Sequence, residues 1–417
     1  MKRLLFVSHA FPPSLLPESL LVLRTVRALE KRGWAITVLT AAFDGDYSDS
    51  SLIAHVPASV KVIRLPSWER FMSGRSFLPS ALRRALLTCG LPEINMAWLP
   101  PVALAMRRIL ENGQFDVVHS WASPHASNIA GLVIKRSARL PWVVHLSDPW
   151  IDNPYSVLTG LRRLSVRMLE RLVIRDADAI VFVTEQAATT VMKKYPAAWT
   201  SRAHVIPHGF DSEMSSGVLR KDPGVPNRRM RLVYVGSFYA GLRTPENLLR
   251  AIRAIADGAP DATNIELSLI GPSAPDYRSM VSDLKLDGIV SCGGPVSFDD
   301  SVRAMAAADV LIVLDAPAAN GAAQSLFLPS KVVDYLMLKK PILGITPLEG
   351  PSADVIRAIG CPVVDPADVA GIAEAIRGLA AQWEARTLGL SEASSQVAEG
   401  YDIHRTTASL EHVLQNA

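Results

Sequence analysis

The chain has 417 residues, of which 49% are hydrophobic and 20% are charged, and its formal net charge is +3. This length predicts two or three domains with ample hydrophobic core, and the composition excludes an intrinsically disordered protein. The small net charge argues against a nucleic-acid-binding protein that works by neutralising many phosphates.

Cys89, Cys292 and Cys361 lie far apart and show neither CxxC nor Cys/His ligand spacing. We therefore expect a cytoplasmic protein with no disulfide framework and no zinc site. The apolar run at the N-terminus is too short for a signal peptide and is interrupted by His9, so it predicts a first buried strand. No segment reaches the roughly 20 apolar residues that span a bilayer.

The first half of the chain alternates apolar strand patterns with amphipathic helix patterns. A strand at 4–8, a helix at 18–32 and a strand at 35–40 form a βαβ unit, whose crossover implies a parallel sheet. The alternation continues with strands at 60–65, 117–120, 142–146 and 179–184, and with helices at 102–111, 126–136 and 161–175. This half is therefore predicted to be a doubly wound domain.

The second half repeats this architecture after a polar stretch at 212–229. A strand at 231–235 is followed by a glycine-containing loop and a helix at 245–257. Further strands are expected at 265–270, 289–292, 310–314, 342–345 and 362–364, and the last helices at 369–382 and 405–415. We predict an α/β fold of two Rossmann-like doubly wound domains facing a central cleft, with domains at 1–205 and 206–385 and C-terminal helices at 386–417 that cross back to the first domain.

The stretch from 327 to 343 contains the most informative helix pattern. Pro329 and Ser330 suit the cap and first turn of a helix, whose pitch places Lys331, Asp334 and Tyr335 within one turn of each other. Helix amides and Lys331 would face phosphate, and Asp334 would accept hydrogen bonds from two ribose hydroxyls. From these residues alone, an amphipathic surface helix with an incidental Lys/Asp pair is an equally good interpretation.

A set of short motifs in a fixed order resembles the retaining nucleotide-sugar glycosyltransferases of family 4, of the bacterial surface-polysaccharide type. The motifs are the opening Phe11-Pro12-Pro13 and the segments at 207–211, 234–243, 269–272, 294–296, 307–310 and 329–336. The resemblance covers almost the whole chain and implies the two-domain GT-B fold, with the second domain binding the nucleotide sugar.

Within that resemblance, Arg243 is expected to clamp the donor pyrophosphate with help from Lys331, and an exposed loop arginine or a solvated lysine are the alternatives. Gly236 allows close backbone approach beside Ser237, while Ser330 and Asp334 complete the expected nucleotide site. Val296 stands where related proteins contact the nucleobase through backbone atoms, although a valine is otherwise ordinary core.

The sequence also departs from the family pattern. Of two family glutamates eight positions apart, the later is Asp334 and the earlier position is Leu326, and the Gly-Gly that follows the opening prolines is absent.

The segment 141–150 in the first half resembles a signature of bacterial surface-polysaccharide members. It contains Asp148, which we expect to bind a sugar hydroxyl or to place the acceptor, with a cap of a helix or turn as the alternative. His119 and His145 are predicted core residues, and His9 and His125 are candidates for the cleft. The resemblance implies front-face displacement, in which the leaving phosphate takes the acceptor proton.

Two further patterns allow two interpretations each. Asp44-Gly-Asp46 looks like a metal-binding DxD sequence, but its polar loop favours a solvated turn, so we expect no metal ion and no cofactor besides the donor substrate. One helix carries a basic stripe and an apolar face: the stripe is Arg163, Arg167, Arg171 and Arg175, and the apolar face is Leu161, Leu164, Met168 and Leu172. Further basic residues of the same domain are Arg83, Arg84, Arg107 and Arg108. This pattern fits docking on an anionic membrane surface at the inner face of the plasma membrane, or a solvated helix face packed on the sheet.

The sequence is thus expected to encode a metal-independent glycosyltransferase that moves a sugar from a nucleotide sugar donor to a glycan or lipid-linked acceptor in polysaccharide biosynthesis. The alternatives are a sugar-nucleotide 2-epimerase of the same architecture and a non-catalytic nucleotide-sugar-binding protein.

Overall fold

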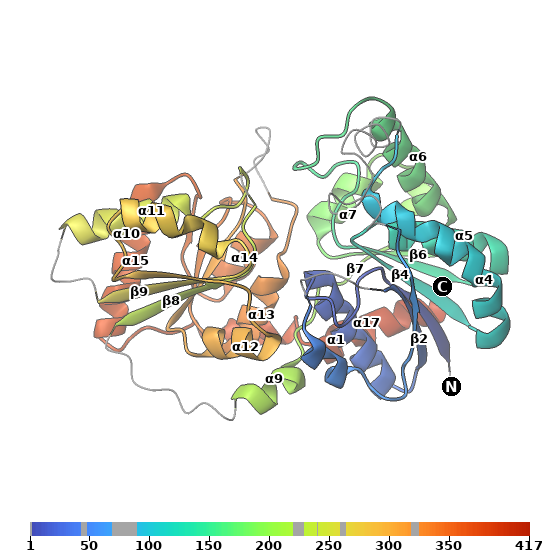
Figure 1. Ribbon diagram of the computed structural model, residues 1–417, viewed down its shortest axis with the longest axis horizontal. Helices are drawn as coiled ribbons and strands as arrows, with labels where there is room; N and C mark the ends of the chain where they lie inside the picture. The colour runs from blue at the N-terminus through green and yellow to red at the C-terminus, as the bar shows by residue number, and fades with distance from the viewer. Residues whose placement is uncertain are drawn as a thin grey trace. The chain divides into compact units, whose positions relative to one another are not determined.

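The computed structural model describes residues 2–42, 48–68, 90–219, 229–239, 241–258, 264–317 and 325–417. The chain forms two compact units (Figure 1): unit 1 comprises Met1–Gly209 and Ile403–Ala417, and unit 2 comprises Phe210–Asp402. This division differs from the expected boundaries at 205/206 and 385/386, because residues 206–209 belong to unit 1 and residues 386–402 to unit 2.

Unit 1 is built on a seven-stranded parallel sheet of order β3-β2-β1-β4-β5-β6-β7. Its strands are β1 (Arg3–Val7), β2 (Ala35–Ala41), β3 (Lys61–Leu65), β4 (Val117–Ala122), β5 (Trp142–Leu146), β6 (Ala179–Phe182) and β7 (Ala203–Val205). The first six agree with the predicted strands. Strand β7 was not predicted, because three half-buried residues carry no readable periodicity.

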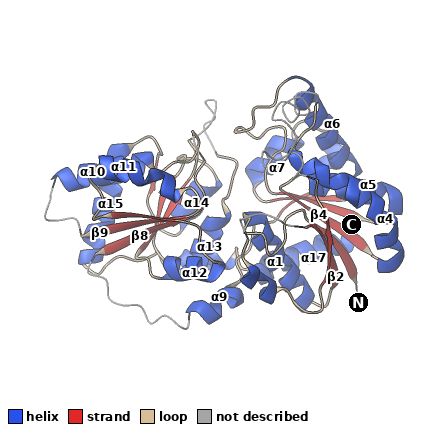
Figure 2. Ribbon diagram, in the orientation of Figure 1, coloured by secondary structure: helices blue, strands red, loops and turns tan. Residues whose placement is uncertain are grey.

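Helices cover both faces of this sheet (Figure 2). On one face α5 (Ala126–Ala138) contacts β4 and β5 and lies between α4 (Leu99–Gly113) and α6 (Gly160–Asp176). On the other, α1 (Pro17–Lys31) contacts β2 and the last helix, α17 (Ile403–Asn416). The remaining helical segments in the described part of unit 1 are α7 (Glu185–Met192), α8 (Ala197–Thr200), η1 (Ser50–His55) and η2 (Ile94–Trp98).

Unit 2 is built on a six-stranded parallel sheet of order β10-β9-β8-β11-β12-β13. Its strands are β8 (Met230–Val235), β9 (Ile265–Ile270), β10 (Val290–Gly293), β11 (Val310–Leu314), β12 (Ile342–Ile345) and β13 (Val363–Val364). Strand β11 is buried along its whole length, as a central strand with helices on both faces must be.

In unit 2, α10 (Glu246–Gly258) and α15 (Val369–Glu384) pack together on one side of the sheet, and α12 (Phe298–Ala306) and α13 (Ser330–Leu338) lie on the other side (Figure 1). The other helical segments are α9 (Ser212–Leu219), α11 (Arg278–Asp283), α14 (Pro351–Ala358), α16 (Ser394–Glu399) and η4 (Ala274–Tyr277). Helix α9 occupies part of the stretch that was predicted only as polar.

Both sheets change winding direction beside their first strand, between β1 and β4 in unit 1 and between β8 and β11 in unit 2. The prediction of two Rossmann-like doubly wound domains is therefore confirmed. Ligands of such sheets bind outside the carboxyl ends of the strands at this switch point. Across the described ranges, every helix is too short or too polar to span a bilayer.

Candidate functional site

The carboxyl end of β8 brings two of the predicted site residues together. Gly236 follows β8 with φ +150°, and a Cβ atom placed there would lie 1.9 Å from Lys331 Cε and 2.1 Å from its Nζ. Gly271, which follows β9, is equally constrained, because its Cβ would lie 2.0 Å from the Gly236 carbonyl oxygen. The missing side chain at Gly236 thus makes room for Lys331, whose ammonium lies over the end of the strand. Contact of this backbone with a donor stays a prediction.

Arg243 is held at the same strand end by a tight turn. The backbone N–H of Tyr239 donates to the Arg243 carbonyl at 2.8 Å, and the Arg243 N–H donates back to the Tyr239 carbonyl at 2.9 Å. The guanidinium lies 5.4 Å from the Tyr239 ring centroid, and its side chain is only 19% exposed. The interpretation of Arg243 as an exposed loop residue is therefore wrong.

A buried carboxylate accompanies Arg243. Asp315 follows the last residue of β11, its side chain is 2% exposed, and its Oδ1 lies 3.6 Å from Arg243 Nη2. The N–H of Ala316 donates to the same oxygen at 2.9 Å. Burial raises the pKa of Asp315. This shift is opposed by Arg243, by the Ala316 N–H and by Lys331. The position was missed in the sequence, although a lone aspartate directly after an apolar central strand is a recognisable signal.

Two buried polar atoms of this pair lack a partner. Arg243 Nε and Asp315 Oδ2 are inaccessible to solvent and have no hydrogen-bond partner in the described part of the chain. Buried polar atoms in proteins are nearly always satisfied, so each exception calls for a bound group or a functional reason.

Lys331 faces a mixed electrostatic environment. Burial and, secondarily, the charge of Arg243 lower the pKa of Lys331 from 10.5 to about 7, while Asp334 and Asp315 oppose this shift. Its Nζ lies 5.4 Å from the centroid of the Tyr234 ring. A bound anion would restore the fully charged ammonium, because it would offset both the desolvation and the repulsion.

Helix α13 carries Lys331, Asp334 and Tyr335, and the last of these has a structural role. The Tyr335 side chain is fully buried, and its hydroxyl donates to the Ile312 carbonyl at 3.2 Å and accepts from the Val235 N–H at 3.5 Å. Tyr335 therefore fixes the helix to β8 and β11 instead of reaching a ligand. Pro329 is the N-cap residue without a side-chain cap, so the expected capping by Ser330 is not observed; Ser330 is the first helical residue.

The other predicted nucleotide-binding positions lie in loops at the carboxyl ends of strands in unit 2. The carbonyl of Ser237, just beyond β8, accepts a hydrogen bond from the Tyr234 hydroxyl at 2.9 Å. Val296 is half-buried in the loop between β10 and α12, so it is not the core residue of the alternative interpretation. Leu326 supplies no carboxylate, and the acid beside the cations comes instead from Asp315.

In unit 1, Asp148 lies half-buried just beyond β5. Its charge adds to the effect of burial in raising the pKa of Glu18, in the first turn of α1, to about 7. Glu18 was not singled out in the sequence, and its place directly after Pro17 at a helix start is the only signal for it.

The histidines of unit 1 are mostly internal. His119 and His145 are buried as predicted: His119 Nδ1 lies 3.0 Å from the Val143 carbonyl, and the His145 ring stacks on Trp121 at 3.6 Å. His125 is also buried and stacks on Trp150 at 4.3 Å, so its expected place in a cleft is wrong. His9 is half-buried, with its ring edge-on to Trp98 at 5.4 Å.

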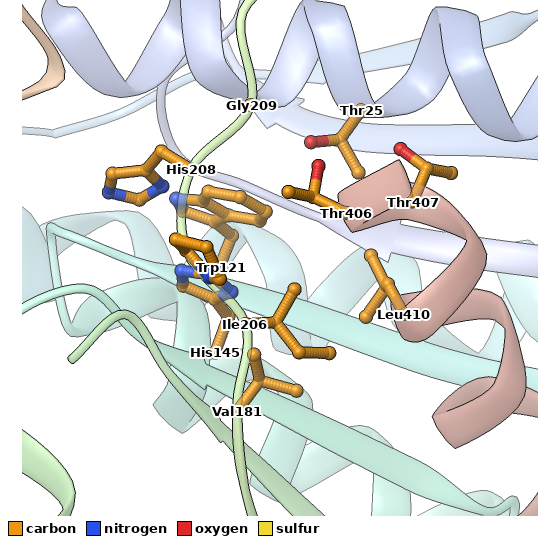
Figure 3. A pocket seen from close by; sticks show the side chains of 11 residues that line it. Thr25, Trp121, His145, Val181, Ile206, His208, Gly209, Thr406, Thr407 and Leu410 are labelled. Carbon is orange, nitrogen blue, oxygen red and sulfur yellow. The ribbon is translucent and has the colours of Figure 1, made fainter. Parts of the chain in front are cut away.

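Trp121, His145 and His208 line a cavity of about 20 Å³, together with side chains of α1 and α17 (Figure 3). Burial lowers the pKa of His208 to about 3 and also lowers the pKa of His145, so both histidines are neutral. The volume of the cavity is enough for about one water molecule.

Within the described ranges, no group of three acidic, histidine or cysteine side chains is placed to hold a metal ion. Asp44 and Asp46 lie outside the described residues.

Known proteins share both the sequence pattern and the fold. Residues 21–209 match a family model described as a Glycosyl transferase 4-like domain. The chain is 24% identical over 406 residues to the 2-deoxystreptamine glucosyltransferase of Streptomyces kanamyceticus, covering 91% of this chain and 97% of that protein. It is 23% identical over 309 residues to a D-inositol 3-phosphate glycosyltransferase of Corynebacterium glutamicum (strain R), covering 70% and 68%. Among solved structures, sucrose-phosphate synthase from Thermosynechococcus elongatus has a TM-score of 0.71 at 16% identity, covering 100% of this chain and 99% of that one.

Proposed function

Since the chain belongs to the family 4 glycosyltransferases and has the GT-B fold, we propose that it transfers a sugar, with retention of configuration, from a nucleotide diphosphate sugar to a glycan or lipid-linked acceptor. The observation that carries the proposal is the gathering of Arg243 and Lys331 at the switch point of unit 2, with Arg243 Nε unpartnered. Ligands of doubly wound sheets bind at this place, and two cations there suit a diphosphate.

In this proposal the donor lies along the strand ends of unit 2. Arg243 and Lys331 bind the diphosphate oxygens, while the backbone at Gly236 and Ser237 and the N-terminus of α13 at Ser330 face the same group. Asp334 accepts hydrogen bonds from the ribose hydroxyls, and backbone atoms at Val296 contact the base. A buried guanidinium stabilises the leaving diphosphate most strongly as it gains charge in the transition state.

The transfer itself requires no protein base. The bond between the anomeric carbon and the diphosphate oxygen breaks, the acceptor oxygen attaches on the same face, and the acceptor proton moves to the leaving diphosphate. Asp148 of unit 1 binds and places the acceptor. No metal ion is required, because Arg243 and Lys331 supply the positive charge that a divalent cation would otherwise provide. Chelator should therefore leave the rate unchanged.

We assign the acceptor to polysaccharide biosynthesis and the reaction to the cytoplasm, at the inner face of the plasma membrane. The resemblance of segment 141–150 to surface-polysaccharide members supports this assignment, as do the unpaired thiols of Cys292 and Cys361.

The deciding experiment is a thermal-shift panel of nucleotide sugars on the full chain, because a ligand at 100 times its dissociation constant stabilises a protein by about 2.7 kcal/mol. Arg243→Ala should abolish the shift, and Arg250→Ala, which removes an exposed arginine of α10 in the same unit, should preserve it.

The products of the stabilising donor then separate the candidate functions. Release of the nucleotide diphosphate only with acceptor supports transfer, and conversion to an epimeric nucleotide sugar without acceptor identifies a 2-epimerase. Binding without either reaction identifies a non-catalytic protein.

A further inference from the structure

Unit 1 contains a second pocket, formed by α6 and the segment after α7. Its volume is about 270 Å³, close to the lower limit for small-ligand pockets. The charged side chains that line it are Asp152, Arg163, Arg167, Glu170, Arg171 and Lys194.

The two carboxylates of this pocket are already engaged. Glu170, whose side chain is 2% exposed, accepts hydrogen bonds from Lys194 Nζ, from the Tyr195 hydroxyl at 2.7 Å and from the Ile151 N–H at 3.0 Å. Lys194 also pairs with Asp152. The lysine charge is therefore neutralised, and the arrangement forms a fixed floor for the pocket.

The three arginines are not neutralised in this way. Arg163, Arg167 and Arg171 recur every four residues, so they project from one side of α6 into the same cavity. In the part of the chain that the structure describes, none of them forms an ion pair with an acid, and Arg171 lies 5.9 Å from the Trp199 ring. Three guanidiniums around a small cavity are suited to a phosphate group, whose oxygens they bind in pairs.

An apolar ridge lies beside this arginine face. Leu161, Leu164 and Met168 are 59%, 53% and 56% exposed, so the alternative of a helix face packed on the sheet does not hold for these three; only Leu172 of the expected apolar face is partly buried in the core. The helix thus shows, in order around its axis, a buried side, a cationic band and an exposed apolar ridge. Surfaces with cations beside exposed apolar side chains are typical of helices that lie in a membrane interface.

We propose that this pocket binds the phosphate group of an anionic membrane lipid while the ridge enters the lipid interface. The apolar ridge selects a lipid over a soluble phosphate, since a free anion would make no use of it. The role of this pocket at the membrane rests on the proposed function, which the pocket extends. Lipid binding by the pocket requires neither the donor nor the acceptor.

The test is flotation of the full chain with vesicles of phosphatidylcholine alone and with vesicles of equal parts phosphatidylcholine and phosphatidylglycerol. The wild-type chain should float only with the anionic vesicles. Each basic side chain near an anionic surface strengthens binding about fivefold, so Arg163→Gln/Arg167→Gln should weaken it about 25-fold. Leu164→Gln/Met168→Gln should also weaken it.

The matched control is Arg107→Gln/Arg108→Gln, which removes the same charge from α4 of the same unit, away from the pocket, and should float like the wild type. Melting curves establish that each variant is folded. An equal loss of vesicle binding in the control variant would show a general effect of charge and would contradict lipid binding by the pocket. Absence of flotation would overturn it too, as would binding of inorganic phosphate, seen by calorimetry, without vesicle binding. Donor thermal shifts on the same variants should be unchanged, so a failed donor assay and a failed flotation assay remain distinguishable.

Discussion

Gly236→Ala tests the contact on which the donor site depends. The new methyl group would begin 1.9 Å from Lys331 Cε and 2.1 Å from Nζ, where carbon atoms in contact stand about 3.5–4 Å apart. The lysine must therefore move by about 1.5 Å or more, away from the end of β8. The residue also has φ +150°, a backbone conformation that side chains rarely adopt.

Two separate costs follow. Backbone strain at such a residue costs about 1–3 kcal/mol, and for a unit of this size each kcal/mol lowers the melting temperature by about 2–4 °C. Misplacement of a charged group by about 1 Å or more can lower the rate about 100-fold. We therefore expect a fall in melting temperature of roughly 2–12 °C and a fall in kcat/KM of about 100-fold.

The assay is release of nucleotide diphosphate from the donor identified by thermal shift, at a temperature well below the melting point of the variant. Gly258→Ala is the control, because nothing lies within 4 Å of its Cβ at the end of α10. That variant should keep full activity and should not be destabilised.

A double-mutant cycle isolates the role of the lysine. If Gly236→Ala acts on catalysis by displacing Lys331, it should cost little further activity in a Lys331→Ala background, whereas the loss of stability from backbone strain should persist. An equal loss of kcat/KM in both backgrounds would refute the reasoning, and so would full activity of the single variant.

Three further predictions concern the charges of the site. Arg243→Lys, which loses the bidentate geometry but keeps the charge, should lower kcat by about 100-fold or more, while Arg250→Lys should have no effect; steady-state kinetics measure both. Asp315→Asn leaves the Arg243 charge buried without a partner, so unit 2 should lose about 3 kcal/mol and melt about 6–12 °C lower by calorimetry; an unchanged melting point would contradict the ion pair. Donor binding should weaken above pH 7, by up to tenfold per pH unit, because Lys331, with a pKa of about 7, must take up a proton to meet the diphosphate. Calorimetric titrations from pH 6 to 9 should show that slope in the wild type and none in Lys331→Ala.

The sequence predicted the fold well where periodicity was strong. Strands such as β5 and β11 have the predicted bounds, because runs of buried apolar residues between polar turns leave little freedom. Strand β7 and helix α9 were missed, because both are short and their stability depends on neighbours that are distant in sequence.

The residues of the proposed site could be named from the sequence, but the contacts between them could not. Arg243 and Lys331 were each expected at the diphosphate, yet nothing in the sequence placed Lys331 against the backbone of Gly236, because that contact joins positions 95 residues apart through the packing of α13. Asp315 could have been noted as an aspartate directly after an apolar central strand, but its pairing with Arg243 could not be predicted, because that contact also joins distant parts of the sequence. For α6 the sequence left two interpretations open, and the exposure of Leu161, Leu164 and Met168 argues against packing of these residues on the sheet.

The two cations of the proposed donor site, Arg243 and Lys331, repel each other. Arg243 contributes to lowering the pKa of Lys331, and Asp315 does not relieve the repulsion fully, because its second oxygen and Arg243 Nε remain unpartnered in a buried place. Buried charges that are incompletely paired cost stability unless a further partner satisfies them. A bound diphosphate would accept a hydrogen bond from the Arg243 guanidinium, favour the protonated form of Lys331 and offset the repulsion between the two cations. The leaving diphosphate carries additional negative charge in the transition state, so these interactions would be stronger there. The two neighbouring cations and the unpartnered buried atoms beside them are therefore an argument for the diphosphate binding proposed there.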